Sequence, residues 1–368
     1  MTLKLNYVII TTNLFTAVYS YKKVIFMNIK KSARPHVLLI TTGGTITMVH
    51  DSATNSLVPA ESSDELIKYV PEVKKVADIT KIDLFNIDST NVQLDHWQKI
   101  ARLIYDNYSK YEAFVITHGT DTLAYTASAL SFMLQNLKKP VILTGSQMPL
   151  GEIGSDARNN FINSFIAATK DLNEVAILFG EHIIRGSRAK KISAFHLNAF
   201  QSVNEKPIGE VGLSIKLFEH RLRASRKKLK LTAEFNKNVF LLKLFPSISP
   251  RIFDKIIEMG YEGIVIEGFG AGNIPTNQNT ILPGIERAAS KNIPIVIGTQ
   301  CLLGEVDLSL YEVGVKAARF GAIPAFDMTL EATLCKLMYA LGQTRELKEV
   351  KRIMKTNICG EMNINLAQ

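Results

Sequence analysis

The chain has 368 residues, 46% of them hydrophobic, which is enough to bury one large core or two ordinary ones. The formal net charge of +9 is moderate for this length. The positive run at residues 221–230 contains no aromatic residues, so nucleic-acid binding is not predicted. The three cysteines have no metal-ligand spacing, which argues against a metal site or a disulfide framework and favours a reducing compartment.

Residues 1–32 precede the first predicted strand and are interpreted as a dispensable N-terminal extension or an over-long start, because Met27 offers a second start. Their apolar stretch, residues 7–21, is interrupted by polar residues and is too short to span a bilayer, so no membrane segment is predicted. A secretory signal is the second interpretation of this segment.

From residue 37 onward, short apolar runs alternate with helical patterns. Runs without polar alternation predict buried strands at residues 37–40, 113–117, 141–144 and 175–179. Apolar residues at helical spacing predict helices at residues 95–108, 123–136 and 159–170. This order predicts a mostly parallel sheet with helices on both faces.

A second α/β unit follows residues 210–235, where the apolar periodicity weakens and positive charge accumulates. Its predicted strands are residues 239–244, 263–267 and 295–298, and its predicted helices are residues 250–259 and 283–291. A last predicted helix starts at Met328 and buries Cys335. The predicted organisation is an N-terminal extension (1–32), an N-terminal catalytic α/β domain (33–220), a solvated linker (221–236) and a smaller C-terminal α/β domain (237–368).

Two turns that contain threonine carry the strongest functional signal. Segment 42–45 (Thr-Gly-Gly-Thr) follows the first predicted strand, and segment 118–122 (His-Gly-Thr-Asp-Thr) follows the second. Open α/β folds bind ligands at the carboxyl ends of their strands, where both turns would lie. Neither turn has the glycine spacing of a dinucleotide site or the lysine of a phosphate loop. Hydroxyl nucleophiles are therefore predicted, with tight turns and helix caps as the structural alternative.

Other polar residues near the strand ends suit an amino-acid ligand. Segment 144–147 (Thr-Gly-Ser-Gln) follows a third strand, and segment 88–90 (Asp-Ser-Thr) lies between the two turns. Asp121 offers a carboxylate for the ammonium group of such a ligand. A threonine nucleophile also needs a base, because its free hydroxyl is a weak nucleophile.

These motifs resemble those of the bacterial-type L-asparaginases, specifically their cytoplasmic (type I) branch. Thr-Gly-Gly-Thr-Ile at residues 42–46 together with His-Gly-Thr-Asp-Thr at 118–122 is a highly specific pair. Leu-Thr-Gly-Ser-Gln-Met-Pro at 143–149 and Phe-Gly-Ala-Gly-Asn-Ile-Pro at 269–275 strengthen the match. The resemblance runs from about Val37 to the C-terminal helix.

The resemblance implies a two-domain α/β amidohydrolase that converts L-asparagine and water to L-aspartate and ammonia without a metal or organic cofactor. By this likeness Thr45 forms the acyl-enzyme, Thr120 is the second essential threonine, and Asp121 lies beside it. The catalytic lysine falls on Lys191, with Lys190 as the alternative if the register slips. The residues that match the substrate-binding positions are Asp88, Ser89, Thr90, Thr120 and Asp121.

The implied mechanism is a double displacement: Thr45 attacks the side-chain amide, ammonia leaves, and water hydrolyses the ester. A lysine in a closed, dehydrated site can lose its proton and then accept one from a threonine hydroxyl. Asp121 would oppose that loss unless it binds the ammonium group of the substrate.

The chain departs from the family pattern at three positions. Many bacterial relatives have a tyrosine in the mobile loop after the first turn, where this chain has Leu57; Tyr311 is predicted to serve instead, with an ordinary helix residue as the alternative. Glu267 replaces an arginine of the enterobacterial allosteric site, so allosteric activation by asparagine is not predicted. Ala271 replaces an asparagine of the periplasmic branch, which supports a cytoplasmic location.

The resemblance also implies a homodimer or homotetramer, because in this family a neighbouring subunit completes each site. One rival function is the amidotransferase subunit that releases ammonia from glutamine for transfer-RNA amidation; it carries an extra N-terminal domain, for which residues 1–32 are too short. A second rival is a non-catalytic protein that binds or senses an amino acid, which Leu57 favours.

Overall fold

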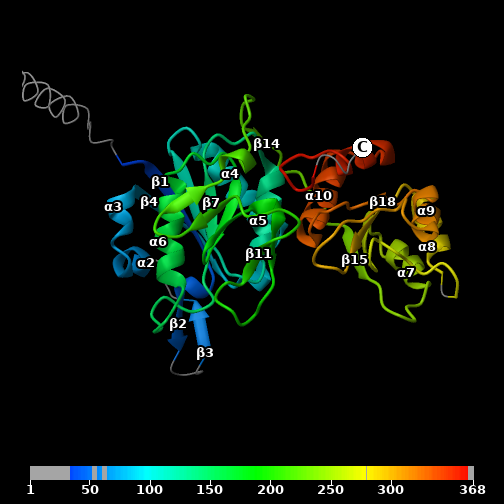
Figure 1. Ribbon diagram of the computed structural model, residues 1–368, viewed down its shortest axis with the longest axis horizontal. Helices are drawn as coiled ribbons and strands as arrows, with labels where there is room; N and C mark the ends of the chain where they lie inside the picture. Colours follow the sequence, from blue (N-terminus) through cyan, green and yellow to red (C-terminus); the bar gives the residue numbers. More distant parts are fainter. Residues whose placement is uncertain (1–33, 52–55, 60–63, 279, 364–368) are drawn as a thin grey trace, which may run out of the picture. The chain divides into compact units, whose positions relative to one another are not determined.

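A large mixed sheet forms the centre of the N-terminal half of the chain in the computed structural model (Figure 1), which describes residues 34–51, 56–59, 64–278 and 280–363. The predicted extension at residues 1–32 lies outside the described residues. The sheet has the strand order β13-β12-β9-β8-β7-β5-β1-β4. Its strands are β1 (His36–Gly43), β4 (Asp78–Ile87), β5 (Ala113–Thr117), β7 (Val141–Thr144), β8 (Val175–Phe179), β9 (His182–Arg185), β12 (Gly209–Val211) and β13 (Ile215–Leu217).

Five neighbouring strands of this sheet, β4, β1, β5, β7 and β8, run parallel. Strands β9, β12 and β13 continue the sheet as antiparallel strands. The parallel strands β1, β5, β7 and β8 are buried along nearly their whole length, as their unbroken apolar runs predict. Because these strands are parallel, the turns after β1, β5 and β7 meet at one edge of the sheet.

Helices cover both faces of this sheet. On one face, α4 (Leu94–Asn107) and α5 (Leu123–Met133) pack against side chains such as Leu38, Ile40 and Phe114. On the other face, α2 (Asp64–Tyr69), α3 (Val73–Val76) and α6 (Ala157–Ala168) pack against Val37, Leu39 and Val115. Successive residues of β1 thus point into two different cores, which is the alternation expected of a strand covered on both sides.

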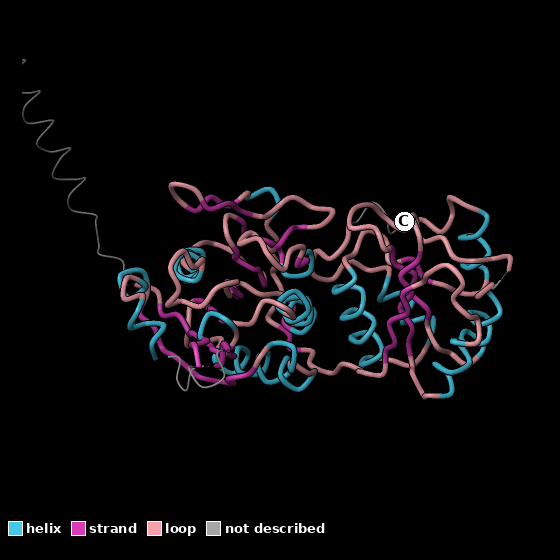
Figure 2. Tube along the Cα trace, turned by 90° about the horizontal axis from the view of Figure 1, so that it is seen from below, coloured by secondary structure: helices cyan, strands magenta, loops and turns pink. Residues whose placement is uncertain are grey.

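A second, smaller sheet forms the C-terminal half. Its four parallel strands are β15 (Val239–Lys243), β16 (Gly263–Gly268), β17 (Ile295–Thr299) and β18 (Ile323–Pro324). Helices α7 (Ile252–Glu258), α8 (Leu282–Ser290) and α9 (Glu312–Arg319) cover one face of this sheet, and α10 (Leu330–Gln343) and α11 (Leu347–Met354) cover the other (Figure 2). The predicted two-domain α/β fold is confirmed.

Helix α10 also packs against α5 of the first half, so it takes part in both cores. The Cys335 thiol donates to the carbonyl oxygen of Tyr125 at 3.6 Å, and the ring of Tyr339 stacks on Phe132. Cys335 is fully buried in this helix, as its place in the apolar pattern predicts. No described helix is long and apolar enough to cross a membrane.

Short elements complete the chain. They are η1 (Thr45–Thr47), β2 (Met48–Asp51), β3 (Ser56–Pro59), η2 (Ser89–Asn91), β6 (Leu134–Gln135), η3 (Gly186–Arg188), β10 (Ala189–Lys191), β11 (Phe200–Ser202), η4 (Glu219–Arg221) and β14 (Lys230–Leu231). The hairpin of β2 and β3 follows the first threonine turn, and β10 pairs antiparallel with β11.

The sequence missed four strands of the large sheet, namely β4, β9, β12 and β13. Strand β4 lies at the edge of the sheet, and its residues are only partly buried, so it lacks the apolar run of a central strand. Strand β9 has four residues, of which only Ile183 and Ile184 are apolar, and β12 and β13 have three residues each, so all three strands are too short to show a periodicity.

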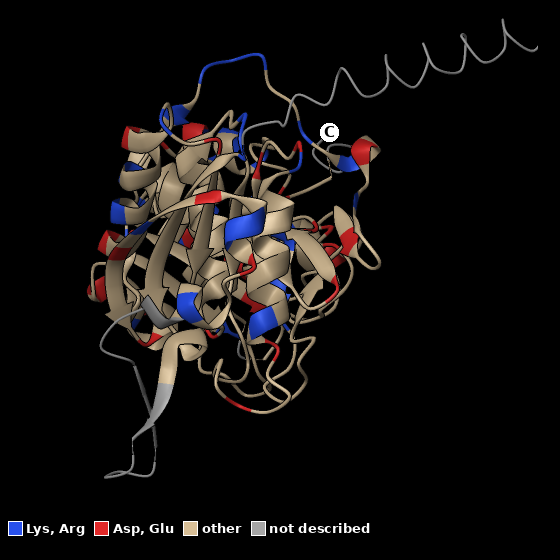
Figure 3. Cartoon of the chain, turned by 90° about the vertical axis from the view of Figure 1, so that its left-hand side faces the viewer, with Lys and Arg blue, Asp and Glu red and all other residues tan. Residues whose placement is uncertain are grey.

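Part of the positive run at residues 221–230 is held by hydrogen bonds. Arg221 donates to the carbonyl oxygen of Pro207, and Arg223 donates to Asn357 and to the carbonyl oxygen of Ile358. On the face drawn in Figure 3, Lys and Arg residues lie among Asp and Glu residues over the helices. The hydrogen bonds of Arg221 and Arg223 fix the first part of the run, whereas the sequence predicted a solvated linker there.

Candidate active site

The turn after β1 requires its two glycines. Gly43 and Gly44 have φ values of 93° and 89°, a region that favours glycine. A Cβ atom on Gly44 would lie 2.3 Å from the backbone nitrogen of Gly119, so the two threonine turns touch at this point. Thr45 and Thr120 each follow one of the touching glycines, which brings both threonines to the same edge of the sheet.

Thr45 opens the 3-10 turn η1 and is partly exposed. Its hydroxyl forms no hydrogen bond within the part of the chain that the structure describes. The neighbouring Thr47, in contrast, uses its hydroxyl to cap the carbonyl oxygen of Gly44 at 3.0 Å. The structure therefore gives Thr47 the capping role that was the alternative for this turn, and leaves the Thr45 hydroxyl open to a ligand.

Lys191 contacts two adjacent residues of the second threonine turn. Its Nζ atom donates to Thr120 Oγ1 at 2.8 Å and to Asp121 Oδ1 at 2.6 Å. The hydroxyl of Thr120, which is buried, donates in turn to Gln147 Oε1 at 3.2 Å. The Asp121 side chain is 57% exposed, so its carboxylate faces solvent beside this buried hydroxyl. A threonine hydroxyl, an amine and a carboxylate within hydrogen-bond reach form a set that can transfer a proton.

The segment after β4 forms a closed turn beside the second threonine turn. Asp88 Oδ1 accepts hydrogen bonds from the backbone nitrogen and the hydroxyl of Thr90, both at 2.8 Å. Ser89 is buried, and a Cβ on Gly119 would lie 2.6 Å from its Oγ atom. The Thr122 hydroxyl donates to the carbonyl oxygen of Ser89 at 2.7 Å and does not cap α5. The structure thus places the segment 88–90 against the second threonine turn, with Ser89 in contact with Gly119 and Thr122.

Two residues that the sequence analysis singled out, Leu57 and Tyr311, have no described side-chain contact with Thr45, Thr120 or Lys191. Leu57 lies in β3, and its side chain is outside what the structure describes. Tyr311 lies at the start of α9 in the C-terminal half, with 52% of its surface exposed. No hydrogen bond or ion pair connects its side chain with any described residue. The structure of a single chain therefore does not bring Tyr311 to Thr45.

Comparisons with known proteins identify the family of this chain. The family model of the asparaginase N-terminal domain matches residues 36–223. The model of the glutaminase/asparaginase C-terminal domain matches residues 238–354. The chain belongs to the asparaginase family. The resemblance that the sequence predicts is confirmed, and the touching threonine turns belong to the asparaginase N-terminal domain.

Relatives in the asparaginase family carry two different names. The L-asparaginase of Thermococcus kodakarensis is 40% identical over 327 residues, which cover 89% of this chain and 98% of that protein. A component of the glutamyl-tRNA(Gln) amidotransferase of Pyrococcus abyssi is 39% identical over 347 residues, which cover 90% of this chain and 78% of that protein.

Solved structures of L-asparaginases have the same fold as this chain. The thermostable L-asparaginase from Thermococcus kodakarensis matches with a TM-score of 0.84 at 39% identity, over 89% of this chain and 99% of that one. L-asparaginase I from Vibrio cholerae matches with a TM-score of 0.82 at 36% identity, over 90% of this chain and 100% of that one.

Two residues that were not among the predicted site residues, Gln147 and Asp156, contact the candidate site. Gln147 accepts from Thr120 and donates through Nε2 to the carbonyl oxygen of His196. The carboxylate of Asp156 accepts from the backbone nitrogens of Gln147 and Met148, which fixes the turn after β7. The motif at 144–147 pointed to Gln147, whereas nothing in the sequence pattern singled out Asp156. Within the described ranges, no group of His, Cys, Asp and Glu residues could hold a metal ion.

His118, the first residue of the second threonine turn, is buried and hydrogen-bonds to the backbone of that turn. Its Nδ1 lies 2.7 Å from the carbonyl oxygen of Gly119, which can only accept, so Nδ1 carries the proton. The Trp97 indole donates to Thr126 Oγ1, which leaves the Thr126 hydroxyl to donate to His118 Nε2 at 2.9 Å. Burial lowers the pKa of His118 from 6.5 to about 4, so the ring is neutral at pH 7.

Acid should destabilise the protein through His118. An unfolded histidine binds a proton near pH 6.5 and the folded one near pH 4, so the stability that neutral His118 contributes is lost as the pH falls between these values. The total is about 3 kcal/mol. Urea unfolding at pH 7 and pH 4.5 should show this loss in the native protein and a smaller one in His118→Gln. Equal losses in both proteins would contradict the assignment.

Proposed function

We propose that this member of the asparaginase family is an L-asparaginase, which hydrolyses the side-chain amide of L-asparagine to L-aspartate and ammonia. The contact of Lys191 with Thr120 and Asp121, beside the open hydroxyl of Thr45, carries the proposal. Family membership and the L-asparaginases among its relatives support it.

The reaction has two displacements. The Thr45 oxygen attacks the amide carbon, the C–N bond breaks, and the nitrogen leaves as ammonia after it gains a proton. Water then attacks the resulting ester and releases L-aspartate and the free threonine. The amine of Lys191 and the hydroxyl of Thr120 are 2.8 Å apart, which suits them to exchange the protons that these steps require.

Asp121 has two roles in this proposal. In the free protein its carboxylate pairs with Lys191 at 2.6 Å. The ammonium group of a bound amino acid would compete for the same carboxylate, together with Asp88, while Ser89 and Thr90 bind its other polar groups. Substrate binding would then weaken the pair and free the Lys191 amine from Asp121, while its contact with Thr120 remains.

A cytoplasmic location and a homodimer or homotetramer are also proposed. The loop after Lys191 exposes apolar side chains, and Phe195 is 86% exposed there. Exposed apolar residues beside a binding site are typical of a surface that another subunit covers. A neighbouring subunit on this loop would close the site to water. It could also bring its own copy of Tyr311 to Thr45, which the single chain does not do.

Ammonia release by the purified protein tests the proposal. We expect turnover with L-asparagine and much weaker turnover with L-glutamine, since a pocket distinguishes one methylene by about 1–3 kcal/mol. Assays with D-asparagine and with L-aspartate control for other sources of ammonia. A folded protein that releases no ammonia from L-asparagine would refute the proposal.

A second candidate is a component of an amidotransferase, which the relative from Pyrococcus abyssi favours. That function predicts no partner-free turnover of L-asparagine, so the same assay separates the two. The third candidate, an amino-acid sensor, predicts L-asparagine binding by calorimetry without release of ammonia. The intact set of Thr45, Thr120, Asp121 and Lys191 favours the enzyme over the sensor.

A further inference from the structure

Strand β10 places two adjacent lysines on opposite sides. It is three residues long and pairs antiparallel with β11, with Lys190 opposite Gln201 and Lys191 opposite Phe200. Successive side chains of a strand point to opposite faces. Lys191 accordingly reaches Thr120 and Asp121, whereas Lys190 reaches the other way, to α10. The register alternative of the sequence analysis thus becomes a second question, namely what Lys190 does.

Lys190 forms an ion pair with a buried carboxylate of the C-terminal half. Its Nζ atom lies 3.0 Å from Oε1 of Glu331, which is in the first turn of α10 and 5% exposed. The other oxygen of Glu331 has no hydrogen-bond partner among the residues that the structure describes. A buried carboxylate needs a counter-charge, and Lys190 is the residue that supplies it by direct contact.

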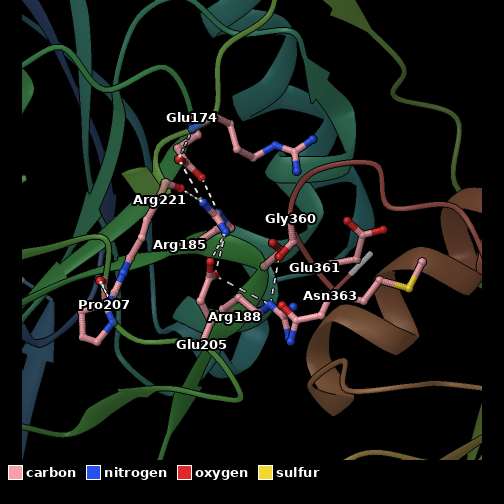
Figure 4. Close-up of polar contacts among 12 residues, drawn as sticks. Glu174, Arg185, Arg188, Glu205, Pro207, Arg221, Gly360, Glu361 and Asn363 are labelled. Atoms are coloured by element: carbon pink, nitrogen blue, oxygen red, sulfur yellow. Dashed lines mark hydrogen bonds and ion pairs between the residues drawn. The ribbon is translucent and has the colours of Figure 1, made fainter. Parts of the chain in front are cut away.

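A second ion pair holds the start of the same strand. Arg188, the last residue of η3, is 1% exposed, and its guanidinium donates to the side chain and the carbonyl oxygen of Asp327 at 2.9 and 3.0 Å. Its Nε atom donates to the carbonyl oxygen of Gly360 at 2.9 Å. Figure 4 shows Arg188 between Gly360 and Glu205, and Glu205 also binds Arg185, the last residue of β9, which directly precedes η3.

We propose that Lys190 is a positioning residue, whose ion pair with Glu331, together with Arg188 and Asp327, holds β10 so that Lys191 reaches Thr120 and Asp121. The C-terminal half would then set the geometry of the catalytic lysine without touching the substrate. The inference rests on the proposed function, because it takes Lys191 as the residue that transfers the proton.

The size of the expected drop in kcat follows from how strongly proton transfer by Lys191 depends on distance. A catalytic group displaced by about 1 Å can lose about 100-fold in rate. Lys191 reaches its partners from a strand of three residues with one described neighbour strand, so few backbone contacts oppose a shift. Loss of the Lys190 pair should therefore lower kcat by about tenfold and leave KM within about twofold, because the substrate-binding residues lie on other elements.

The test separates positioning from stability. Lys190→Met alone leaves the Glu331 carboxylate buried without a counter-charge and should destabilise the protein. The double variant Lys190→Met with Glu331→Met replaces both partners by apolar side chains and should regain most of that stability. A positioning role predicts that kcat of the double variant stays about tenfold low. Recovery of kcat along with stability would overturn the proposal. Lys190→Arg, which keeps the pair, is the matched control and should retain kcat.

A second readout does not depend on catalysis. Limited acetylation of the folded proteins, followed by mass spectrometry of the peptide that contains Lys191, reports how firmly its amine is held. We expect its labelling rate, relative to exposed Lys99 on α4, to rise at least about threefold in the double variant. An unchanged rate would overturn the proposal even if the native protein failed to hydrolyse L-asparagine, so failure of the proposed function and failure of the inference are distinguishable.

Discussion

Replacing Thr45 with valine is expected to lower ammonia release from L-asparagine by at least about 1,000-fold, because the variant keeps the shape of the side chain and loses the attacking oxygen. The open hydroxyl of Thr45 beside the Thr120 turn is the structural reason. Steady-state assays of ammonia release measure the loss. Mass spectrometry of acid-quenched native protein should find the aspartyl ester on the peptide that contains Thr45.

Two variants in the same turn serve as controls for this prediction. Thr45→Ser keeps a hydroxyl and should retain measurable turnover. Thr47→Val removes the hydrogen bond to the Gly44 carbonyl oxygen, which should cost about 1 kcal/mol of stability but less than tenfold in turnover. An ester on the Thr120 peptide, with turnover retained in Thr45→Val, would move the nucleophile to the threonine that Lys191 contacts.

Replacing Gly44 with alanine is expected to damage both the fold and the site. The added Cβ would lie 2.3 Å from the Gly119 nitrogen and 2.5 Å from its Cα atom, and φ at this residue is 89°. Backbone strain and the forced separation of the two turns together should cost about 2–4 kcal/mol. Because the turns carry Thr45 and Thr120, turnover should also fall by about 100-fold.

Gly154 provides the matched control for this substitution. Its φ is 82°, close to that of Gly44, but a Cβ there would meet nothing within 4 Å. Gly154→Ala should therefore lose only the backbone cost of about 1 kcal/mol and keep its activity. Urea unfolding and the ammonia assay on both variants measure the difference. Similar losses in the two proteins would mean that the contact between the turns has no special importance.

The sequence predicted the part of the fold that apolar runs determine. Buried parallel strands such as β5 and β7 were predicted at their observed bounds, because both of their faces are covered. Edge strand β4 was missed, since its pairing to β1 fixes it and its own composition does not. The segment that follows it, residues 88–90, nevertheless lies against the second threonine turn through Ser89, and the sequence had singled out this segment from its motif.

The site itself was predictable from motifs only as far as local order reaches. Strand alternation, which the sequence could not assign for so short a strand, directs Lys191 to Thr120 and Lys190 to Glu331. His118 and Asp156 contribute through contacts between distant segments, and single-sequence patterns do not report such contacts. That Tyr311 replaces the loop tyrosine as the base stays a prediction.

The last described residues of the chain bind groups that were synthesised much earlier. Arg188 depends on the carbonyl oxygen of Gly360, and the fully buried Lys336 depends on Glu361 at 2.6 Å. On a translating ribosome, where the amino-terminal half emerges first, Arg188 lacks the Asp327 carboxylate and the Gly360 carbonyl oxygen until those residues have been synthesised. The region that carries both threonines is therefore expected to complete its folding only after residue 360 has emerged, and a chain cut before Asp327 would have its threonine turns formed but the strand that carries Lys191 unsupported.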